Sequence, residues 1–365
     1  MNYALPLTFL LVPFGFLSFG LIHDGHHLAI LLAAILVLAW QTGNRFVRAF
    51  ITYAVLWQVF IFIYAMAYKI PKYVINSSLD ATLYAFVGGM IYYAVTVSRF
   101  KIESFYNIVC VSALIQTAIG LSQYMGFDPV LWTIALFFKA ESLLPGHVTG
   151  SLGNNNFLAA YLAISLPFFF RPKWWLAVPV IAFLLYASNT TSAVVPAILV
   201  SAWFFGDRLS KRERRLAVAG GLLVVIAYAC FQHTPFWENP RWQLWMTAVQ
   251  QILHDPRTTI FGMGPGAGWG QGYPMHNEWL QVFHQYGIIG LSLLAAFVAT
   301  IPRNNKILFA SFLIIAINMF GNYSLHLAPS AFLIIIVAGL MEREAGRVLS
   351  HPPEEVKPAA RPRKK

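Results

Sequence analysis

Long apolar stretches recur along the chain and are separated mostly by short polar connections. Most contain about 16 to 22 residues, enough for an α-helix to cross a hydrocarbon layer of about 30 Å. We expect them at 4–22, 28–42, 49–68, 79–97, 102–125, 156–170, 174–188, 191–206, 216–231, 286–301, 307–324 and 328–341. They do not alternate apolar and polar residues as the strands of a membrane barrel do. The pattern therefore predicts an all-α, polytopic transmembrane protein with about twelve spans.

Two connections between the apolar runs are long. They cover residues 126–155 and 232–285, and an alternating arrangement of spans places both on the same face. Long connections in a compact fold commonly carry binding or catalytic residues. We therefore expect one transmembrane catalytic domain over residues 1–346, with a site that draws on both segments. Residues 347–365, rich in Pro, Lys and Arg, are expected to form a disordered tail.

The second long segment has a predicted structure of its own. Asn239 is a good N-cap for a helix that begins at Pro240, and Pro256 ends this helix. About 14 residues extend over only about 21 Å, too little to cross a bilayer. Its apolar positions recur at spacings of three and four residues, at Trp242, Trp245, Met246, Val249, Ile252 and Leu253. This pattern predicts an amphipathic helix on the outer interface, with its tryptophans at headgroup depth.

A glycine-rich stretch, GMGPGAGWGQG at residues 262–272, follows this helix. It lacks the preceding strand and the spacing of a dinucleotide-binding turn, so we expect a hairpin whose backbone closely approaches a ligand or a neighbouring helix. Pro274 then starts another helix, which places His276 and Asn277 in its first turn. There the helix dipole disfavours a charged imidazolium, and the free N–H groups of the turn form an anion site.

Composition supports a membrane protein, and charge sets its orientation. Hydrophobic residues make up 58% of the chain and charged residues 11%, against about 25% charged in soluble proteins. With the N-terminus inside, most of the 25 lysines and arginines lie on inner loops and the tail; the outer side keeps only Lys69, Lys72, Lys139, Arg241 and Arg257. The positive-inside rule therefore predicts that both termini are cytoplasmic. The net charge of +11 is not gathered into a groove, so no nucleic-acid partner is expected.

Two polar islands interrupt this apolar background. They are GSLGNNN at residues 150–156 and MHNEWLQ at residues 275–281. His, Asn and Gln side chains lose water at the ends of membrane helices, so they are usually retained there for chemistry or binding. The islands are therefore the first places to look for a site.

The first island, extended as GSLGNNNFLAAYL, resembles the G-T-x-G-N-P-N-x-x-A-x-x-L signature of the O-antigen ligase and polymerase superfamily. RWQLW at 241–245, followed by Pro256 and the glycines from 262, is similar to that family's R-x-x-x-W…P…G-x-G-x-G block. HNEWLQ at 276–281 with GIIG at 287–290 is similar to its H-N-x-x-L-Q…G-x-x-G block. Together the three ordered blocks cover about residues 147–290.

The resemblance implies a glycosyltransferase of the bacterial inner membrane that works on the periplasmic face. Such enzymes take a glycan from an undecaprenyl-diphosphate carrier and attach it to an acceptor hydroxyl, without nucleotide sugar, metal or other cofactor. The acceptor is lipid A–core in the ligases, a growing glycan in the polymerases, and a protein serine or threonine in a third branch. A ligase-like activity is the leading interpretation, and a polymerase of the same superfamily is the alternative.

Residue types can be matched to this chemistry. His276 is the candidate base that takes the acceptor's proton, and Arg241 is the candidate for holding the lipid diphosphate. The other substrate-binding candidates are Lys139, His147, Asn154, Asn156, Asn277 and Gln281. Several have a structural alternative: His276 as an unreactive hydrogen-bonding group and Arg241 as a snorkelling interfacial residue. Asn154 and Asn156 could be N-caps of the next span, and Gln281 could be a helix neighbour of Asn277.

The chain also departs from the family pattern. Ala193 follows Ser192 where many members carry Arg, His147 stands where an Arg often precedes the first block, and Asn155 replaces the usual proline. These differences bear on the phosphate-binding set and on the acceptor. Two functions from other classes remain open: a transporter of lipid-linked sugars, which typically has an internal repeat and broken helices near the bilayer midplane, and an inactive scaffold.

Overall fold

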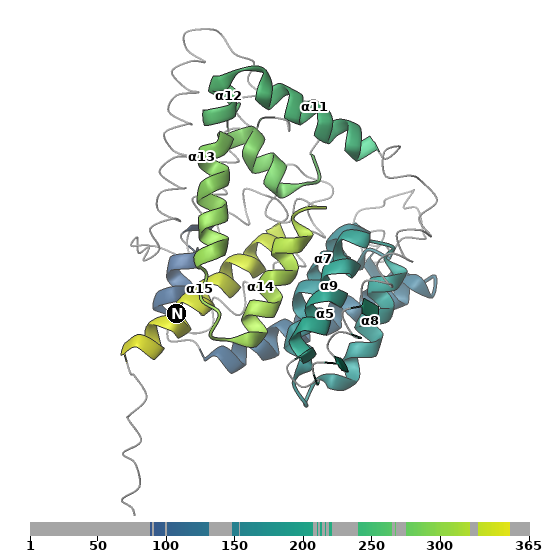
Figure 1. Ribbon diagram of the computed structural model, residues 1–365. Helices are drawn as coiled ribbons and strands as arrows, with labels where there is room; N and C mark the ends of the chain where they lie inside the picture. The colour runs from purple at the N-terminus through teal and green to yellow at the C-terminus, as the bar shows by residue number, and fades with distance from the viewer. Residues whose placement is uncertain are drawn as a thin grey trace, which may run out of the picture.

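The computed structural model describes residues 88–89, 91–98, 101–130, 148–152, 154–206, 240–264, 267, 275–321 and 328–350, with isolated positions between 210 and 220 (Figure 1). Within these ranges the chain forms α-helices, short 3₁₀ helices and turns. The all-α fold is therefore confirmed for this part of the chain. Outside the described residues lie the spans expected at 4–22, 28–42 and 49–68, most of the span expected at 216–231, and the tail beyond residue 350.

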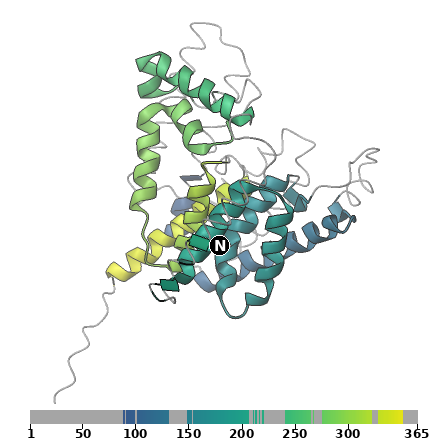
Figure 2. The same cartoon turned by 45° about the vertical axis from the view of Figure 1, so that its right-hand side comes forward.

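The described helices fall into two groups along the chain. The first group contains α5 (Ile102–Tyr124), η2 (Gly150–Leu152), α7 (Asn155–Ser165), η3 (Leu166–Phe170), η4 (Trp175–Ala177), α8 (Val178–Ala187) and α9 (Thr191–Gly206). The second contains α11 (Pro240–His254), α12 (Pro256–Phe261), α13 (Glu278–Thr300), α14 (Lys306–Asn318) and α15 (Ala328–Ser350). Figures 1 and 2 show α11 and α12 at one end of the molecule, beyond the bundle formed by the other helices.

Helix α7 lies at the centre of the first group. Residues 158–165 are all buried, and the helix packs against α5, α8, α9 and α14. The buried hydroxyl of Tyr161 donates to Ser112 Oγ of α5 at 2.8 Å. The hydroxyl of Ser311 in α14 donates to the carbonyl of Ile164 at 2.8 Å. Because these polar groups are buried, each bond favours a single arrangement of the three helices.

The observed helix lengths agree only partly with the expected spans. Helix α9 has the bounds predicted for it, Thr191–Gly206. Helix α14 ends at Asn318 rather than at 324, and its 13 residues extend over about 20 Å, less than the bilayer core. Two of the described helices, α5 and α13, are long and apolar enough by length and composition to cross a membrane, although α13 is bent at Gly287. Twelve spans are therefore not established by the described residues.

The span expected at 156–170 is divided into two kinds of helix. Its α-helical part, α7, ends at Ser165, and the chain continues as the 3₁₀ helix η3 to Phe170. Pro167 stands at the start of η3. A proline lacks the N–H group of the α-helical ladder and its ring clashes with the carbonyl four residues earlier, so the last turn tightens.

Helix α13 is bent within its length. Gly287 has φ 63° and ψ −164°, a conformation that only glycine adopts readily, and it separates a first limb at 278–286 from a second limb at 288–300. Figure 1 shows the two limbs meeting at a sharp elbow beside α12. The span expected at 286–301 corresponds to the second limb. The polar first limb was expected as a separate short helix beginning at Pro274.

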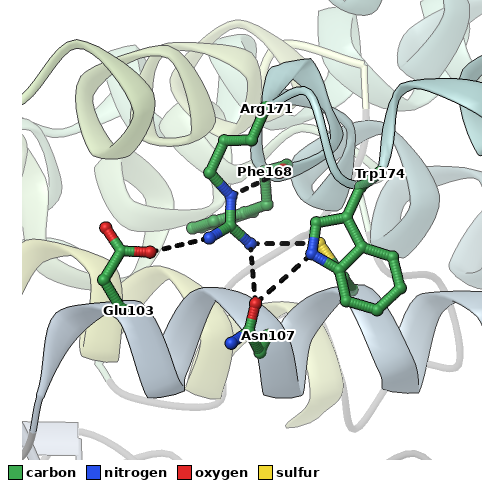
Figure 3. A network of polar contacts seen from close by, with 6 residues as sticks. Glu103, Asn107, Phe168, Arg171 and Trp174 are labelled. Carbon is green, nitrogen blue, oxygen red and sulfur yellow. Dashed lines mark hydrogen bonds and ion pairs between the residues drawn. The ribbon is translucent and has the colours of Figure 1, made fainter.

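Basic residues gather at one end of the bundle, where Arg171 makes the network shown in Figure 3. Its guanidinium forms an ion pair with Glu103 at 2.8 Å and donates to the carbonyl of Phe168 at 3.1 Å. It also donates to Asn107 at 3.3 Å, and the indole N–H of Trp174 donates to the same oxygen at 3.3 Å. The network fixes the end of η3 to the start of α5.

Two further cations lie at the same end. Lys306, at the start of α14, lies 4.9 Å from the ring centroid of Phe204 at the end of α9. Arg343 of α15 is buried and donates to the carbonyl of Ser98 at 3.2 Å. Arg171 and Lys306, expected on inner loops, and Arg343, expected after the last span, therefore lie at the same end of the bundle.

Candidate functional site

Both polar islands lie at the opposite end of the bundle. The first is held by two buried glutamines of α5, Gln116 and Gln123. The amide oxygen of Gln123 accepts the backbone N–H groups of Thr149 at 2.9 Å and Gly150 at 2.7 Å. Its amide nitrogen donates to the carbonyl of Gly150 at 3.0 Å. Gln116 accepts from the N–H of Ser151 at 2.9 Å, so the loop before α7 has a fixed path.

Gly150 is required in this loop. Its φ is +60°, and a Cβ atom there would lie 2.7 Å from Gln116 Oε1 and 2.9 Å from Leu158 Cδ1. A side chain there would be strained by the positive φ and would displace the ends of Gln116 and Leu158. The first glycine of the island therefore serves the close approach of the backbone to α5.

The asparagines of the first island make structural contacts. Asn154 is the N-cap of α7, and its side chain accepts from the N–H of Asn156 at 2.8 Å. The side chain of Asn155 donates to the carbonyl of Ser188 at 3.1 Å. Asn156 accepts from the hydroxyl of Thr190 at 3.0 Å. The helix-capping alternative is confirmed for Asn154, and Asn156 joins α7 to the start of α9.

A short polar connection leads from the first island toward the second. Asn318, the last residue of α14, donates its side-chain N–H to the carbonyl of Ser192 at 2.6 Å. Gly321 lies so close to Ser192 that a Cβ atom on it would be 2.8 Å from the serine Cβ. The carbonyl of Gly321 accepts from Arg241 Nη1 at 3.1 Å. The start of α9 and the end of α14 thus link the two islands.

Arg241 and Trp245 lie one turn apart on α11 and contact the neighbourhood of the second island. Arg241 is half-buried. The indole N–H of Trp245 donates to the carbonyl of Met275, the residue before His276. The four-residue spacing puts both side chains on one face of the helix. The spacing of the arginine and tryptophan in this block therefore has a structural explanation.

His276 is half-buried and has a φ of +50°, which is uncommon for a residue with a side chain. Burial, and second the positive charge of Arg241, lower the pKa of His276 from 6.5 to about 4. The imidazole is therefore uncharged at neutral pH. The sequence predicts a neutral ring from the helix dipole, but the causes here are desolvation and the nearby guanidinium.

The start of α13 corrects one expectation and limits another. The helix begins at Glu278, with Asn277 as its N-cap accepting from the N–H of Leu280 at 3.0 Å, so His276 and Asn277 precede the first turn. The N–H of Glu278 donates to the carbonyl of Met319 at 2.8 Å. Protein oxygens accept the N–H groups of Glu278 and Leu280, so these two groups are not available to the anion site expected at this turn.

Gln281 contacts both the glycine-rich stretch, through its side chain, and Asn277, whose carbonyl accepts its backbone N–H at 2.8 Å. Its side-chain N–H donates to the carbonyl of Ala267 at 2.9 Å, and its oxygen accepts from the N–H of Met275 at 3.4 Å. Gln285, one turn later, also donates to Ala267 at 3.4 Å. The hairpin was expected to approach a ligand or a neighbouring helix. The described part of it approaches a helix, the first limb of α13.

The surface of α11 is divided into three sectors. The buried sector contains Ala248 and Ile252 and faces the protein, together with the half-buried Arg241 and Trp245. The exposed apolar sector contains Trp242, Met246 and Leu253. The exposed polar sector contains Gln243, Thr247, Gln250 and His254. The single apolar stripe expected from the sequence is therefore split, because Trp245 and Ile252 pack inward while their neighbours stay exposed.

The structure brings together some of the predicted site residues. Arg241, His276 and Asn277 lie within one neighbourhood, and Asn154 and Asn156 lie at the same end of the bundle with structural partners. Lys139 and His147 lie outside the described residues. A neutral imidazole beside a fixed guanidinium is suited to accept a proton while an anionic group binds to the cation.

Sequence reasoning missed the two glutamines that position the first island. Gln116 and Gln123 stand seven residues apart in an otherwise apolar run, which places them on one face of α5. Polar residues at that spacing in a membrane helix were the available signal.

The comparisons with known proteins add no relative. No protein-family model matches the chain, and a search of curated proteins finds no significant match. The resemblance to the O-antigen ligase superfamily stays a prediction based on the three sequence blocks.

Proposed function

We propose that this chain is an integral-membrane glycosyltransferase of the O-antigen ligase type. It moves a glycan from undecaprenyl diphosphate to an acceptor hydroxyl, such as one on lipid A–core, at the periplasmic face of the bacterial inner membrane. The observation that carries the proposal is the pairing of an uncharged His276 with Arg241 on an adjacent segment. The three sequence blocks supply the substrate class.

In this mechanism the acceptor oxygen attacks the anomeric carbon of the donor sugar. His276 takes the hydroxyl proton as the new C–O bond forms, and the bond to the diphosphate breaks with its electron pair on the leaving oxygen. Arg241 stabilises the charge that develops on the diphosphate. Arg241 is held in place by the carbonyl of Gly321 at 3.1 Å, so little reorganisation is needed when the anion arrives.

The donor itself improves the base. In the free protein the charge of Arg241 contributes to the low pKa of His276. A diphosphate bound to Arg241 offsets that charge, so the pKa of His276 rises toward its ordinary value when the donor is present. Proton transfer is then most favourable when both substrates are in place.

The membrane arrangement supports the same interpretation. The cationic end of the bundle, with Arg171 and Lys306, faces the cytoplasm, and the end with Arg241 and His276 faces the periplasm. The exposed apolar sector of α11 lies in the outer leaflet of the membrane, so Arg241 stands near the depth of lipid diphosphates.

The test is glycan transfer in membranes supplied with undecaprenyl-diphosphate-linked glycan and a lipid acceptor. His276→Ala is expected to reduce the transfer rate by about 10²- to 10⁴-fold, the usual contribution of a general base. The matched control is His254→Ala, which changes an exposed histidine on α11. Equal rates for His276→Ala and the wild type would refute His276 as the base.

A further inference from the structure

The described part of the glycine-rich hairpin and the elbow of α13 meet where two glycine backbones cross. A Cβ atom on Gly262 would lie 2.3 Å from the carbonyl oxygen of Gln285. A Cβ atom on Gly287 would lie 2.3 Å from the carbonyl oxygen of Ile260 and 2.6 Å from the nitrogen of Gly262. Both glycines also have positive φ values, +82° and +63°. No other residue type fits either position without moving a backbone.

The crossing is also hydrogen-bonded. The bend at Gly287 takes carbonyls of the first limb out of the helical ladder. The N–H of Met263 donates to the carbonyl of His284 at 2.8 Å, and the N–H of Gly264 donates to the carbonyl of Gln285 at 2.9 Å. The N–H groups of Met263 and Gly264 thus replace the helical donors that the bend removes.

Side chains of the first limb complete the attachment. Gln281 and Gln285 both donate to the carbonyl of Ala267, at 2.9 and 3.4 Å. His284 is buried and lies 3.2 Å from the side-chain oxygen of Gln251 on α11. The limb is therefore held to both the hairpin and α11 along its length, from the elbow almost to its N-terminus.

The position of His276 depends on this limb. His276 lies directly before Asn277, the N-cap of the limb, while Arg241 lies on α11. The limb has only about nine residues, so its direction is set by its attachments rather than by its own stability. The start of the limb is also held by the bond from the N–H of Glu278 to the carbonyl of Met319. We expect a change in the elbow to tilt the limb between these attachments and so to displace His276 relative to Arg241.

We infer that the crossing of Gly262 and Gly287 is a positioning device that sets the first limb of α13 so that His276 faces Arg241. The inference takes the role of His276 from the proposed function, but it concerns the geometry of the free protein. Gly262 and Gly287 are positioning residues, since they act through the limb and do not touch the reacting groups.

The experiment measures the titration of His276 by NMR in histidine-labelled protein in nanodiscs, without donor or acceptor. The signal is assigned by its loss in His276→Gln. In the wild type the midpoint is expected near pH 4. In Gly262→Ala and Gly287→Ala the limb moves, His276 gains water and distance from Arg241, and the midpoint rises toward 6.5.

The matched control is Gly346→Ala on α15, where an added Cβ meets nothing within 4 Å and the titration is expected to stay as in the wild type. A folded Gly287→Ala protein with an unchanged His276 midpoint would overturn the inference. Where Gly287→Ala does not fold, Gln285→Met serves instead, because it removes one attachment of the limb with a side chain of similar size. An unchanged His276 midpoint in that variant would also contradict the inference.

Failure of this inference and failure of the proposed function are separable. A shifted midpoint in the glycine variants, together with unimpaired transfer by His276→Ala, supports the positioning device and refutes the catalytic role. An unchanged midpoint together with an inactive His276→Ala supports the catalytic role and refutes the positioning device. Where both hold, the glycine variants are expected to lower kcat more than they raise KM for the donor, because the base moves while Arg241 keeps its anchor on Gly321.

Discussion

The two polar islands occupy the same end of the bundle, but they differ in what their side chains contact. In the first island the asparagines cap α7 or join it to neighbouring segments, and Gln123 fixes the preceding loop. In the second, an uncharged His276 lies beside the cation of Arg241. Polar residues at helix ends are the same signal in the sequence. The partners of these side chains show that the first island is structural and that the second is suited to chemistry.

The difference has a physical basis. Amide side chains such as Gln123 both donate and accept, so they can satisfy a loop backbone in a dry environment without carrying charge. An imidazole changes its charge within the range that buried surroundings can shift, and a nearby guanidinium biases it toward the neutral form. Changes in the first island should therefore lower stability, and changes in the second should alter titration and transfer.

The largest expected effect on stability comes from Gln123→Leu. Backbone N–H groups of Thr149 and Gly150 lose their acceptor, and each unsatisfied group costs about 1–3 kcal/mol, so the free energy of unfolding should fall by about 3 kcal/mol. Unfolding in mixed detergent measures the change. The neighbouring Ser122→Ala, at an exposed bond to the carbonyl of Phe127, is the control and should change little. A normal stability for Gln123→Leu would contradict the scaffold role.

Arg241→Gln should have an intermediate effect, confined to the second island. Loss of the cation raises the pKa of His276 above about 4, although burial, the larger cause, still holds it below 6.5. Transfer needs neutral His276, so activity is present above this pKa and lost as pH falls through it. The acid limb of the pH–rate profile without saturating donor should therefore move to higher pH. Donor affinity should fall about tenfold through loss of a charged hydrogen bond.

The control for Arg241→Gln is Arg257→Gln, which removes an exposed cation of α12. It should leave both the acid limb and the donor affinity as in the wild type. A limb that moves equally in the two variants would indicate a general effect of outer charge rather than a local one.

The smallest expected effect, the loss of one N-cap bond in each island, compares the two islands most directly. Asn154→Ala and Asn277→Ala each remove one N-cap bond, to Asn156 and to Leu280, and each should cost about 1 kcal/mol of stability. Only Asn277→Ala changes the segment beside His276. We therefore expect matched losses in thermal stability, and a loss of transfer rate in Asn277→Ala alone. Equal rates in the two variants would remove the functional distinction between the islands.

Local sequence signals predicted several elements well. Helix α9 follows from one uninterrupted apolar run, and α11 begins at Pro240 because proline fits the first helical position. The end of α11 before Pro256 was also predicted, but the short helix α12 that follows was not; Asp255 caps it by accepting from the N–H of Arg257 at 2.9 Å. Such features depend on residues close together in the chain, so the sequence contains the information.

The elbow of α13 was not predictable in this way. Gln281 and Gln285 are polar, and the apolar run begins only after them, so the sequence indicated a span from 286 and a separate short helix before it. The two limbs instead join at a bend at Gly287, where N–H groups of the glycine-rich stretch donate to carbonyls that have lost their helical donors. The split stripe of α11 has the same origin, since packing against α13 selects which apolar residues are buried.

The sequence by itself determined that the chain is helical, that its apolar runs are suited to a membrane, and which polar residues merit attention. These follow from hydrophobic periodicity, proline and glycine placement and charge distribution, which are local or compositional. Only the tertiary structure decided which polar groups face one another. Gln123 binds the loop at Gly150, Gln281 binds Ala267 of the glycine-rich stretch, and Arg241 lies close enough to His276 to lower its pKa. The physical reason is that hydrogen bonding and desolvation depend on distances between segments far apart in the chain.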